Sequence, residues 1–168
     1  NESGVPVWDD YPGPICDPTS AYRATASEQA DFIIQSALYA TYAGADNLFF
    51  FQLYDDCGNQ PGGTNHDDFD QCTGNDPGGD AFGLFSNPND PNEALCYWDH
   101  PNPESGRAGA TAFQTLTRYF QGVEPLWRLR HNGDNQELIA FYQPATGQRI
   151  IGFWARDTME ETAVFPTT

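Results

Sequence analysis

The most constraining feature of this sequence is a helical pattern that runs directly into a strand with apolar residues on both faces. Small and aliphatic side chains recur at helical spacing over residues 28–43, with Ser27 as the expected N-cap and Gly44 past the end. The run Asn47–Tyr54 then lacks the alternation of a half-exposed strand. Such a run is typical of a parallel strand that is covered on both sides. We therefore predict a helix at 28–43 and a buried parallel strand over Leu48–Tyr54.

A second helical pattern occurs further along the chain. It is expected from about Ser105 to Gln121, with Gly122 past its end. The order helix, strand, helix implies right-handed βαβ units, in which helices cover a parallel sheet. One full parallel strand and two helices do not make a core by themselves, so we expect this chain to be part of a longer α/β domain.

Beyond residue 124 the helical period disappears, and short strands separated by hairpin turns take its place. We place a domain boundary at 124/125, with an α/β domain over 1–124 and the beginning of an all-β sandwich over 125–168. The expected strands are Leu126–Arg130, Gln136–Tyr142, Gln148–Ala155 and the start of another at Thr162–Phe165, with turns at Asn132–Asn135 and Pro144–Gly147.

The charge balance and the lengths of the apolar runs exclude two classes of partner. The 24 Asp and Glu residues against 7 basic residues, all of them arginine, give a formal net charge of -17. This charge repels phosphate backbones, so we expect no nucleic-acid partner. No apolar run approaches the roughly 20 residues of a membrane-spanning helix, so we expect no membrane span either.

The four cysteines lie in stretches rich in Gly, Pro, Asp and Asn, and none forms a CxxC pair. This placement argues against a structural zinc site and favours two disulfides in an oxidising, secreted setting. Four cysteines allow three connectivities. The spacing favours Cys57 with Cys72, which would close a loop of about 15 residues and contribute about 3 kcal/mol, and would leave Cys16 with Cys96.

A long acidic, Gly-rich segment separates the two helical patterns. Its aspartates could hold a calcium ion, which prefers several oxygen ligands. Their spacing does not match an EF-hand, however, and a solvated acidic loop is the stronger interpretation. We therefore expect no cofactor and no metal site, with calcium in the 67–80 loop as the open alternative. The residues concerned are Asp67, Asp68, Asp70, Asp76 and Asp80.

Three segments stand in an order that resembles a known enzyme family. Asn1–Val7 places Glu2 two residues before a glycine, Phe82–Phe85 follows the predicted parallel strand, and Ala108–Leu116 opens the second helix. In this order they resemble the end of strand 7, the segment after strand 8 and the start of helix 8 in retaining glycoside hydrolases with a (β/α)8 barrel. That clan contains cellulases, xylosidases and iduronidases. The strands after residue 125, Gln148–Trp154 above all, resemble the β-sandwich that many of these enzymes append.

The resemblance implies a partial (β/α)8 TIM barrel, from the end of strand 7 to helix 8, followed by part of a β-sandwich. It implies a secreted enzyme that cleaves the O-glycosidic bonds of a poly- or oligosaccharide with two carboxyl groups about 5–5.5 Å apart. Glu2 would be the catalytic nucleophile. The acid/base residue would come from strand 4, outside this chain, so the isolated chain would be inactive and its partner would be the rest of the barrel.

The resemblance also places a carbohydrate-binding surface around Glu2, because aromatic rings stack on the apolar faces of sugars. For each aromatic residue, simple loop packing is the competing interpretation, and we expect Trp127 and Trp154 in the core of the β-module. A non-catalytic extracellular protein on the same fold, such as a surface or filament subunit, is the alternative function. The expected substrate-binding residues are Trp8, Tyr11, Tyr54, Asp55 and Trp98.

Overall fold

A computed structural model of the chain is organised as two compact units, and each helix contributes to both of them. Unit 1 comprises Asn1–Ile34 and Asn47–Gln114, and unit 2 comprises Gln35–Asp46 and Thr115–Thr168. The residues that the structure describes are 2–5, 7, 24–55, 82–85, 106–131 and 135–156.

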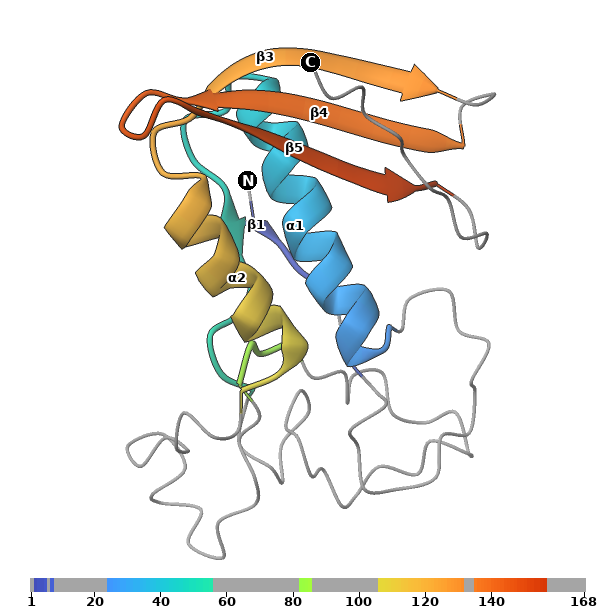
Figure 1. The fold of residues 1–168 in the computed structure, drawn as a ribbon. Coiled ribbons are helices and arrows are strands. Elements are labelled where there is room, and N and C mark those ends of the chain that lie inside the picture. Colours follow the sequence, from blue (N-terminus) through green and yellow to red (C-terminus); the bar gives the residue numbers. More distant parts are fainter. Residues whose placement is uncertain are drawn as a thin grey trace, which may run out of the picture. The chain divides into compact units, whose positions relative to one another are not determined.

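Unit 1 is built around a short pair of parallel strands (Figure 1). Strand β1 (Glu2–Ser3) pairs in parallel with β2 (Phe49–Phe50), and helix α1 (Ala26–Tyr42) lies between them in sequence. Tyr54 makes a further parallel bridge to Phe85. The predicted parallel direction of this strand is therefore confirmed.

A capping box starts helix α1. The Thr25 hydroxyl oxygen accepts a hydrogen bond from the Glu28 amide (3.1 Å), and the Glu28 carboxylate accepts one from the Thr25 amide (2.7 Å). This reciprocal pair satisfies two amides that have no partner within the helix. Thr25, not Ser27, is therefore the N-cap, and the helix begins two residues earlier than predicted.

The two-sided burial predicted for the parallel strand is wrong. Phe50 packs edge-on against Phe32 of α1 and Phe113 of α2 (Ala108–Tyr119), with ring centroids 6.5 and 6.0 Å apart. By contrast, 61% of Phe49 and 56% of Leu53 is exposed. One face of the segment is thus covered by helices, and the other presents apolar side chains to solvent.

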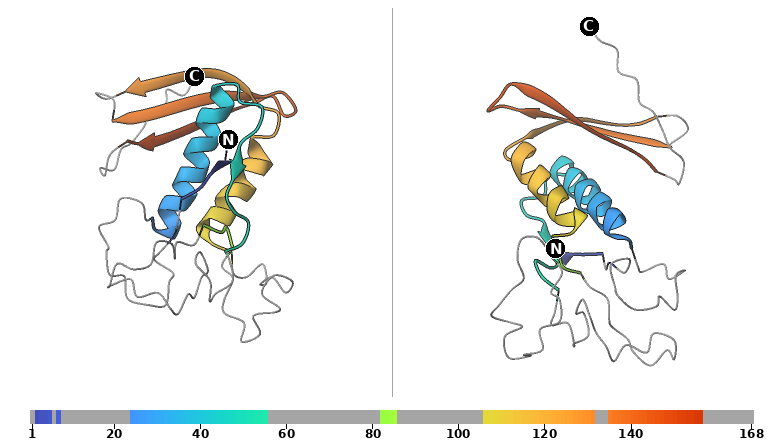
Figure 2. Two further views of the ribbon diagram at one scale, coloured as in Figure 1. Left: turned by 180° about the vertical axis from the view of Figure 1, so that it is seen from behind. Right: turned by 60° about the horizontal axis from the view of Figure 1, so that its bottom comes forward.

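Unit 2 contains an antiparallel sheet of three strands in the order β3-β4-β5 (Figure 2). All three predicted strands are confirmed, as is the turn between the second and third. The segments Asn132–Asp134 and Thr162–Phe165 lie outside the described residues, and the domain boundary at 124/125 stays a prediction. The strands are β3 (Glu124–His131), β4 (Gln136–Gln143) and β5 (Gln148–Ala155).

The two faces of this sheet differ. On the inner face, Phe141 packs edge-on against Phe120, and Trp154 against Tyr39 of α1, with centroids 5.3 and 5.4 Å apart. Trp154, which we expect in the core, is only half-buried at this contact. Trp127, however, is 41% exposed, so its predicted core position is wrong. Strand register places Trp127 on the outer face, because it lies opposite Ala140 rather than Ile139.

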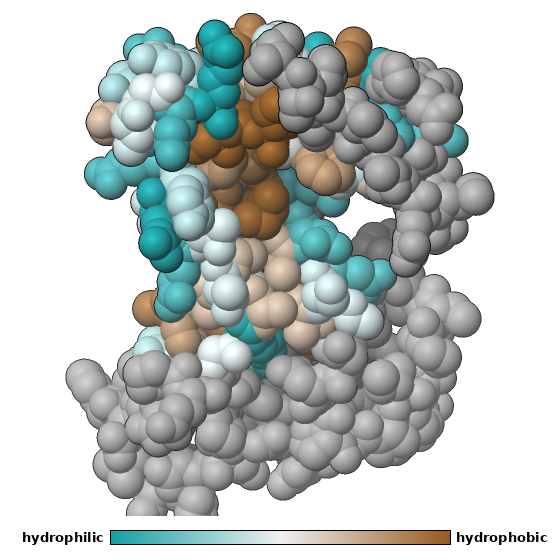
Figure 3. Space-filling model, viewed as in Figure 1, coloured by the Kyte–Doolittle hydropathy of each residue, from teal (hydrophilic) through white to brown (hydrophobic). Residues whose placement is uncertain are grey.

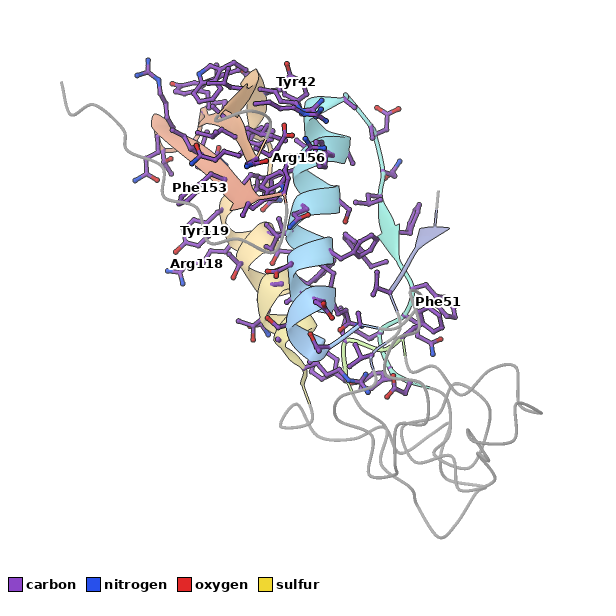
Figure 4. All side chains as sticks on the ribbon, turned by 90° about the vertical axis from the view of Figure 1, so that its right-hand side faces the viewer. Tyr42, Phe51, Arg118, Tyr119, Phe153 and Arg156 are labelled. Atoms are coloured by element: carbon purple, nitrogen blue, oxygen red, sulfur yellow. The ribbon has the colours of Figure 1, made fainter. Side chains whose placement is uncertain are left out.

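Further large apolar side chains accompany Trp127 on that outer face. Figure 3 shows hydrophobic residues, coloured brown, at the surface in the upper half of its view. Figure 4 shows Phe153 on the other side of the sheet from Arg156. The chain as a whole is a mixed α/β protein with two helices and a small antiparallel sheet in the residues described. The exposed outer-face residues are Trp127, Leu129, Ile151 and Phe153.

Candidate active site

Glu2, the predicted nucleophile, lies on β1 with its backbone opposite Phe49. We expected it beside the end of the next strand, at Tyr54 and Asp55. The register differs: Tyr54 comes five residues after Phe49, a distance of up to about 16 Å along an extended strand. Glu2 is therefore level with the exposed Phe49 and not with Tyr54.

Steric crowding requires a glycine at position 4, two residues after Glu2. A Cβ atom on Gly4 would lie 2.5 Å from the carbonyl oxygen of Phe51 and 3.2 Å from the ring of Phe82. Only a residue without a side chain allows these segments to approach so closely. Phe51 is itself exposed (Figure 4), so the segment that carries Glu2 runs beside an apolar surface.

Asp55 forms a buried ion pair with Arg107, the residue just before α2. Arg107 Nη2 donates to Asp55 Oδ2 (2.6 Å), and Nη1 donates to Oδ1 (2.8 Å), with 3% and 0% of the two side chains exposed. Two parallel hydrogen bonds of this kind are the strong, oriented form of an Arg–carboxylate contact. Asp55 therefore clamps the end of the parallel segment to the start of α2.

Gly83 completes this clamp with its backbone. Its amide donates to Asp55 Oδ1 (2.7 Å), and its carbonyl oxygen accepts from Arg107 Nη1 (2.6 Å). A Cβ atom on Gly83 would lie 2.6 Å from both Asp55 Oδ1 and the Phe85 carbonyl oxygen, so no larger residue fits. The Gly83 amide and the Arg107 guanidinium thus fix the carboxylate, and the Gly83 carbonyl oxygen fixes the guanidinium.

Gln29 of α1 holds the neighbouring segments together. Its side-chain amide donates to the carbonyl oxygens of Val5 and Phe82, both at 3.2 Å. The side chain is buried, and its Oε1 accepts no hydrogen bond in the part of the chain that the structure describes. Sequence reasoning missed Gln29 and Arg107, because their neighbouring residues do not indicate hydrogen bonds to residues 24 to 53 positions away.

Of the other predicted site residues, only Tyr54 is described. Its ring lies 5.3 Å from that of Phe85, and it is partly buried. The remaining predicted binding residues and cysteines lie outside the described residues, as does the whole candidate calcium loop. They are Trp8, Tyr11, Trp98, Cys16, Cys57, Cys72, Cys96 and residues 67–80.

Within the described residues, no cluster of three or more His, Cys, Asp or Glu side chains could hold a metal ion. No helix in that part of the chain is both long enough and apolar enough to cross a membrane. Comparison with known proteins finds no match to a family model, to a curated protein or to a solved structure.

Proposed function

We propose that this chain is the C-terminal part of a secreted retaining glycoside hydrolase, with Glu2 as nucleophile and a poly- or oligosaccharide as substrate. The observation that carries the proposal is the parallel pairing of β1 with β2, with α1 between them in sequence. Barrels of the (β/α)8 type are built from such units and carry their catalytic residues on the carboxyl ends of the strands. Glu2 lies on β1, the first strand of this strand–helix–strand arrangement.

The exposed apolar residues of the parallel segment support a missing part of the same domain. Phe49, Phe51 and Leu53 are all exposed on a segment that has helices on its other side. In a barrel, these positions would be covered by the other strands and their side chains. The rest of the barrel would also supply the acid/base carboxyl group, and the outer face of the β3-β4-β5 sheet would meet a second sheet of the appended sandwich.

The decisive test is covalent labelling of the complete protein with a 2-fluoro-glycoside, which traps the glycosyl-enzyme intermediate of a retaining mechanism. We expect the label on Glu2 and the loss of several orders of magnitude in kcat for Glu2→Gln. Glu124→Gln, which makes the same change in charge at an exposed position, is the control. A label on another residue, or near-normal turnover by Glu2→Gln, would refute the proposal.

A non-catalytic carbohydrate-binding or surface protein on the same fold is the second candidate. The register of Glu2 favours it, since Glu2 is not level with Tyr54 and Asp55. The engagement of Asp55 with Arg107 and Gly83 points the same way. This candidate predicts saturable sugar binding with no hydrolysis and no covalent label. The secreted setting is tested separately, because two disulfides would leave the unreduced protein without thiols that react with an alkylating reagent.

A further inference from the structure

A carboxylate in the middle of the antiparallel sheet gathers an arginine cluster in unit 2. Glu137, on the central strand β4, has a completely buried side chain. It accepts hydrogen bonds from Arg128 Nε (2.5 Å) and Arg130 Nε (3.1 Å), both on the edge strand β3. Arg156, just after β5, places its Nε 4.0 Å from the same carboxylate. Three of the chain's 7 basic residues therefore surround one acid.

Among the described residues, Glu137 does not take up all the N–H donors of the two arginines of β3. A guanidinium carries five N–H donors. Arg130 uses only its Nε toward Glu137, and 43% of its side chain is exposed. Among the residues described, none accepts a hydrogen bond from its Nη1 or Nη2 atoms. Arg128 engages Glu137 through Nε and Nη2, and 32% of its side chain is exposed.

Neighbouring contacts hold these guanidinium groups in place. The Arg128 guanidinium carbon lies 4.9 Å from the centre of the Tyr39 ring, a cation–π geometry. The Tyr39 hydroxyl is also hydrogen-bonded to Glu137. Arg128 and Arg130 stand two residues apart on one face of β3, so both heads converge on one carboxylate. Their donors are thus oriented before any ligand arrives.

Within the part of the chain that the structure describes, the cluster is locally positive, although the chain as a whole is acidic. Arg128 and Arg130 with Glu137 leave one excess positive charge. The chain around them carries a net charge of -17. Long-range repulsion disfavours a polyanion, whereas a small anion can reach the cluster and be held by short-range hydrogen bonds.

We propose that Arg128 and Arg130 form a binding site for a small ligand that carries a carboxylate group. Two N–H donors on one edge of a guanidinium match the two oxygens of a carboxylate, and Glu137 already shows such a two-point contact through Nε and Nη2 of Arg128. The carboxylate could belong to a simple organic acid or to an acidic sugar. The site does not depend on the glycosidase proposed above.

The test is an NMR titration of the arginine side chains in the 168-residue chain, which has 7 arginines and no lysine. Acetate, D-glucuronate and inorganic phosphate are added separately at constant ionic strength. We expect saturable shifts of the Arg128 and Arg130 Nε–H signals with a carboxylate, while the Arg118 signal stays in place. Tighter binding of glucuronate than of acetate would identify an acidic sugar as the source. Equal binding would identify a simple acid.

Arg130→Gln should weaken carboxylate binding by at least about tenfold, because it removes a charged two-point contact. Arg118→Gln is the matched control, since it makes the same change in charge at an exposed helix position and should leave binding unchanged. Arg130→Lys keeps the charge but loses the fork, and should also weaken binding. Unsaturable shifts of all arginines, saturation by phosphate alone, or equal loss in Arg118→Gln would overturn the proposal.

Discussion

Two buried carboxylates, one in each unit, are bound by arginine in different ways. Among the described residues, Asp55 pairs with Arg107, and both partners are almost fully removed from solvent. Glu137 is equally buried, but its arginines are about a third to two fifths exposed. The first pair is closed, because the guanidinium faces the carboxylate and the Gly83 backbone. The second is open, because its arginines bridge from the carboxylate to water.

This difference determines what each cluster can do. A closed pair must match its charges internally, since an unpaired charge in the interior costs several kcal/mol. An open cluster can lose one partner and recover part of the energy from water, and it can also accept a ligand. The structure therefore combines one ionic contact that joins chain segments with another that offers donors to solvent.

Removing the charge of Asp55 should have the largest effect. We expect Asp55→Asn to cost about 3–5 kcal/mol of unfolding free energy, because the buried Arg107 would lose the carboxylate charge that it pairs with. Asp46→Asn, at an exposed position, should change stability by less than about 0.5 kcal/mol. Urea unfolding measures both, and hydrogen exchange of the Gly83 amide locates the loss. Equal effects of the two variants would show that the closed pair contributes nothing special.

Glu137→Gln should be milder, at about 2 kcal/mol, because the freed arginines can turn to water. Glu124→Gln, on the same sheet but exposed, is the control and should be nearly neutral. Thermal and urea unfolding of the two variants supply the comparison. A cost as large as that of Asp55→Asn would mean that the open cluster behaves as a closed one.

The stabilisation from Glu137 should also depend on pH. Burial alone would raise the pKa of Glu137, but hydrogen bonds from Arg128, Tyr39 and Arg130 outweigh it and hold the pKa below its usual value. A lowered carboxyl pKa stabilises the folded state above the unfolded pKa of about 4.3, and this stabilisation disappears as the pH falls through the folded pKa. The difference between wild type and Glu137→Gln should therefore shrink on acidification below about pH 4. A difference that stays constant from pH 7 to pH 3 would contradict this assignment.

The N-cap of α1 should give the smallest of these effects on the free energy of unfolding. Thr25→Ala removes the N-cap of α1 and should cost about 1 kcal/mol. Ser27→Ala, the same kind of change two residues on, should cost little, because Ser27 is inside the helix and exposed. Helix content and unfolding free energy check both variants. The reverse order would restore Ser27 as the cap.

The sequence predicts what depends on neighbouring residues. The strands β3, β4 and β5 were expected to within one or two residues, because alternation and turn residues are local signals. Thr25 was missed as the cap only because Ser27 is also a good capping residue. The parallel direction of β2 followed from its apolar run and the helix before it.

Contacts between distant residues were not predictable in this way. Arg107 and Asp55 are 52 positions apart, and nothing in either neighbourhood selects the other. The register that sets Glu2 opposite Phe49 depends on how two strands slide past each other, which one sequence does not encode locally. The exposure of Trp127 follows from register as well, since a shift of one residue changes the face of the sheet.

The apolar outer face of the sheet leads us to expect that the solubility of the chain depends on salt. This face can associate with the same face of another molecule through its exposed apolar side chains, which are Trp127, Leu129, Ile151 and Phe153. In dilute buffer, the net charge of -17 keeps two molecules apart, since repulsion reaches about 30 Å at 0.01 M salt. At 0.15 M salt the reach falls to about 8 Å, while the apolar attraction remains. Wherever no second sheet covers this face, we therefore expect added salt to favour self-association of the chain.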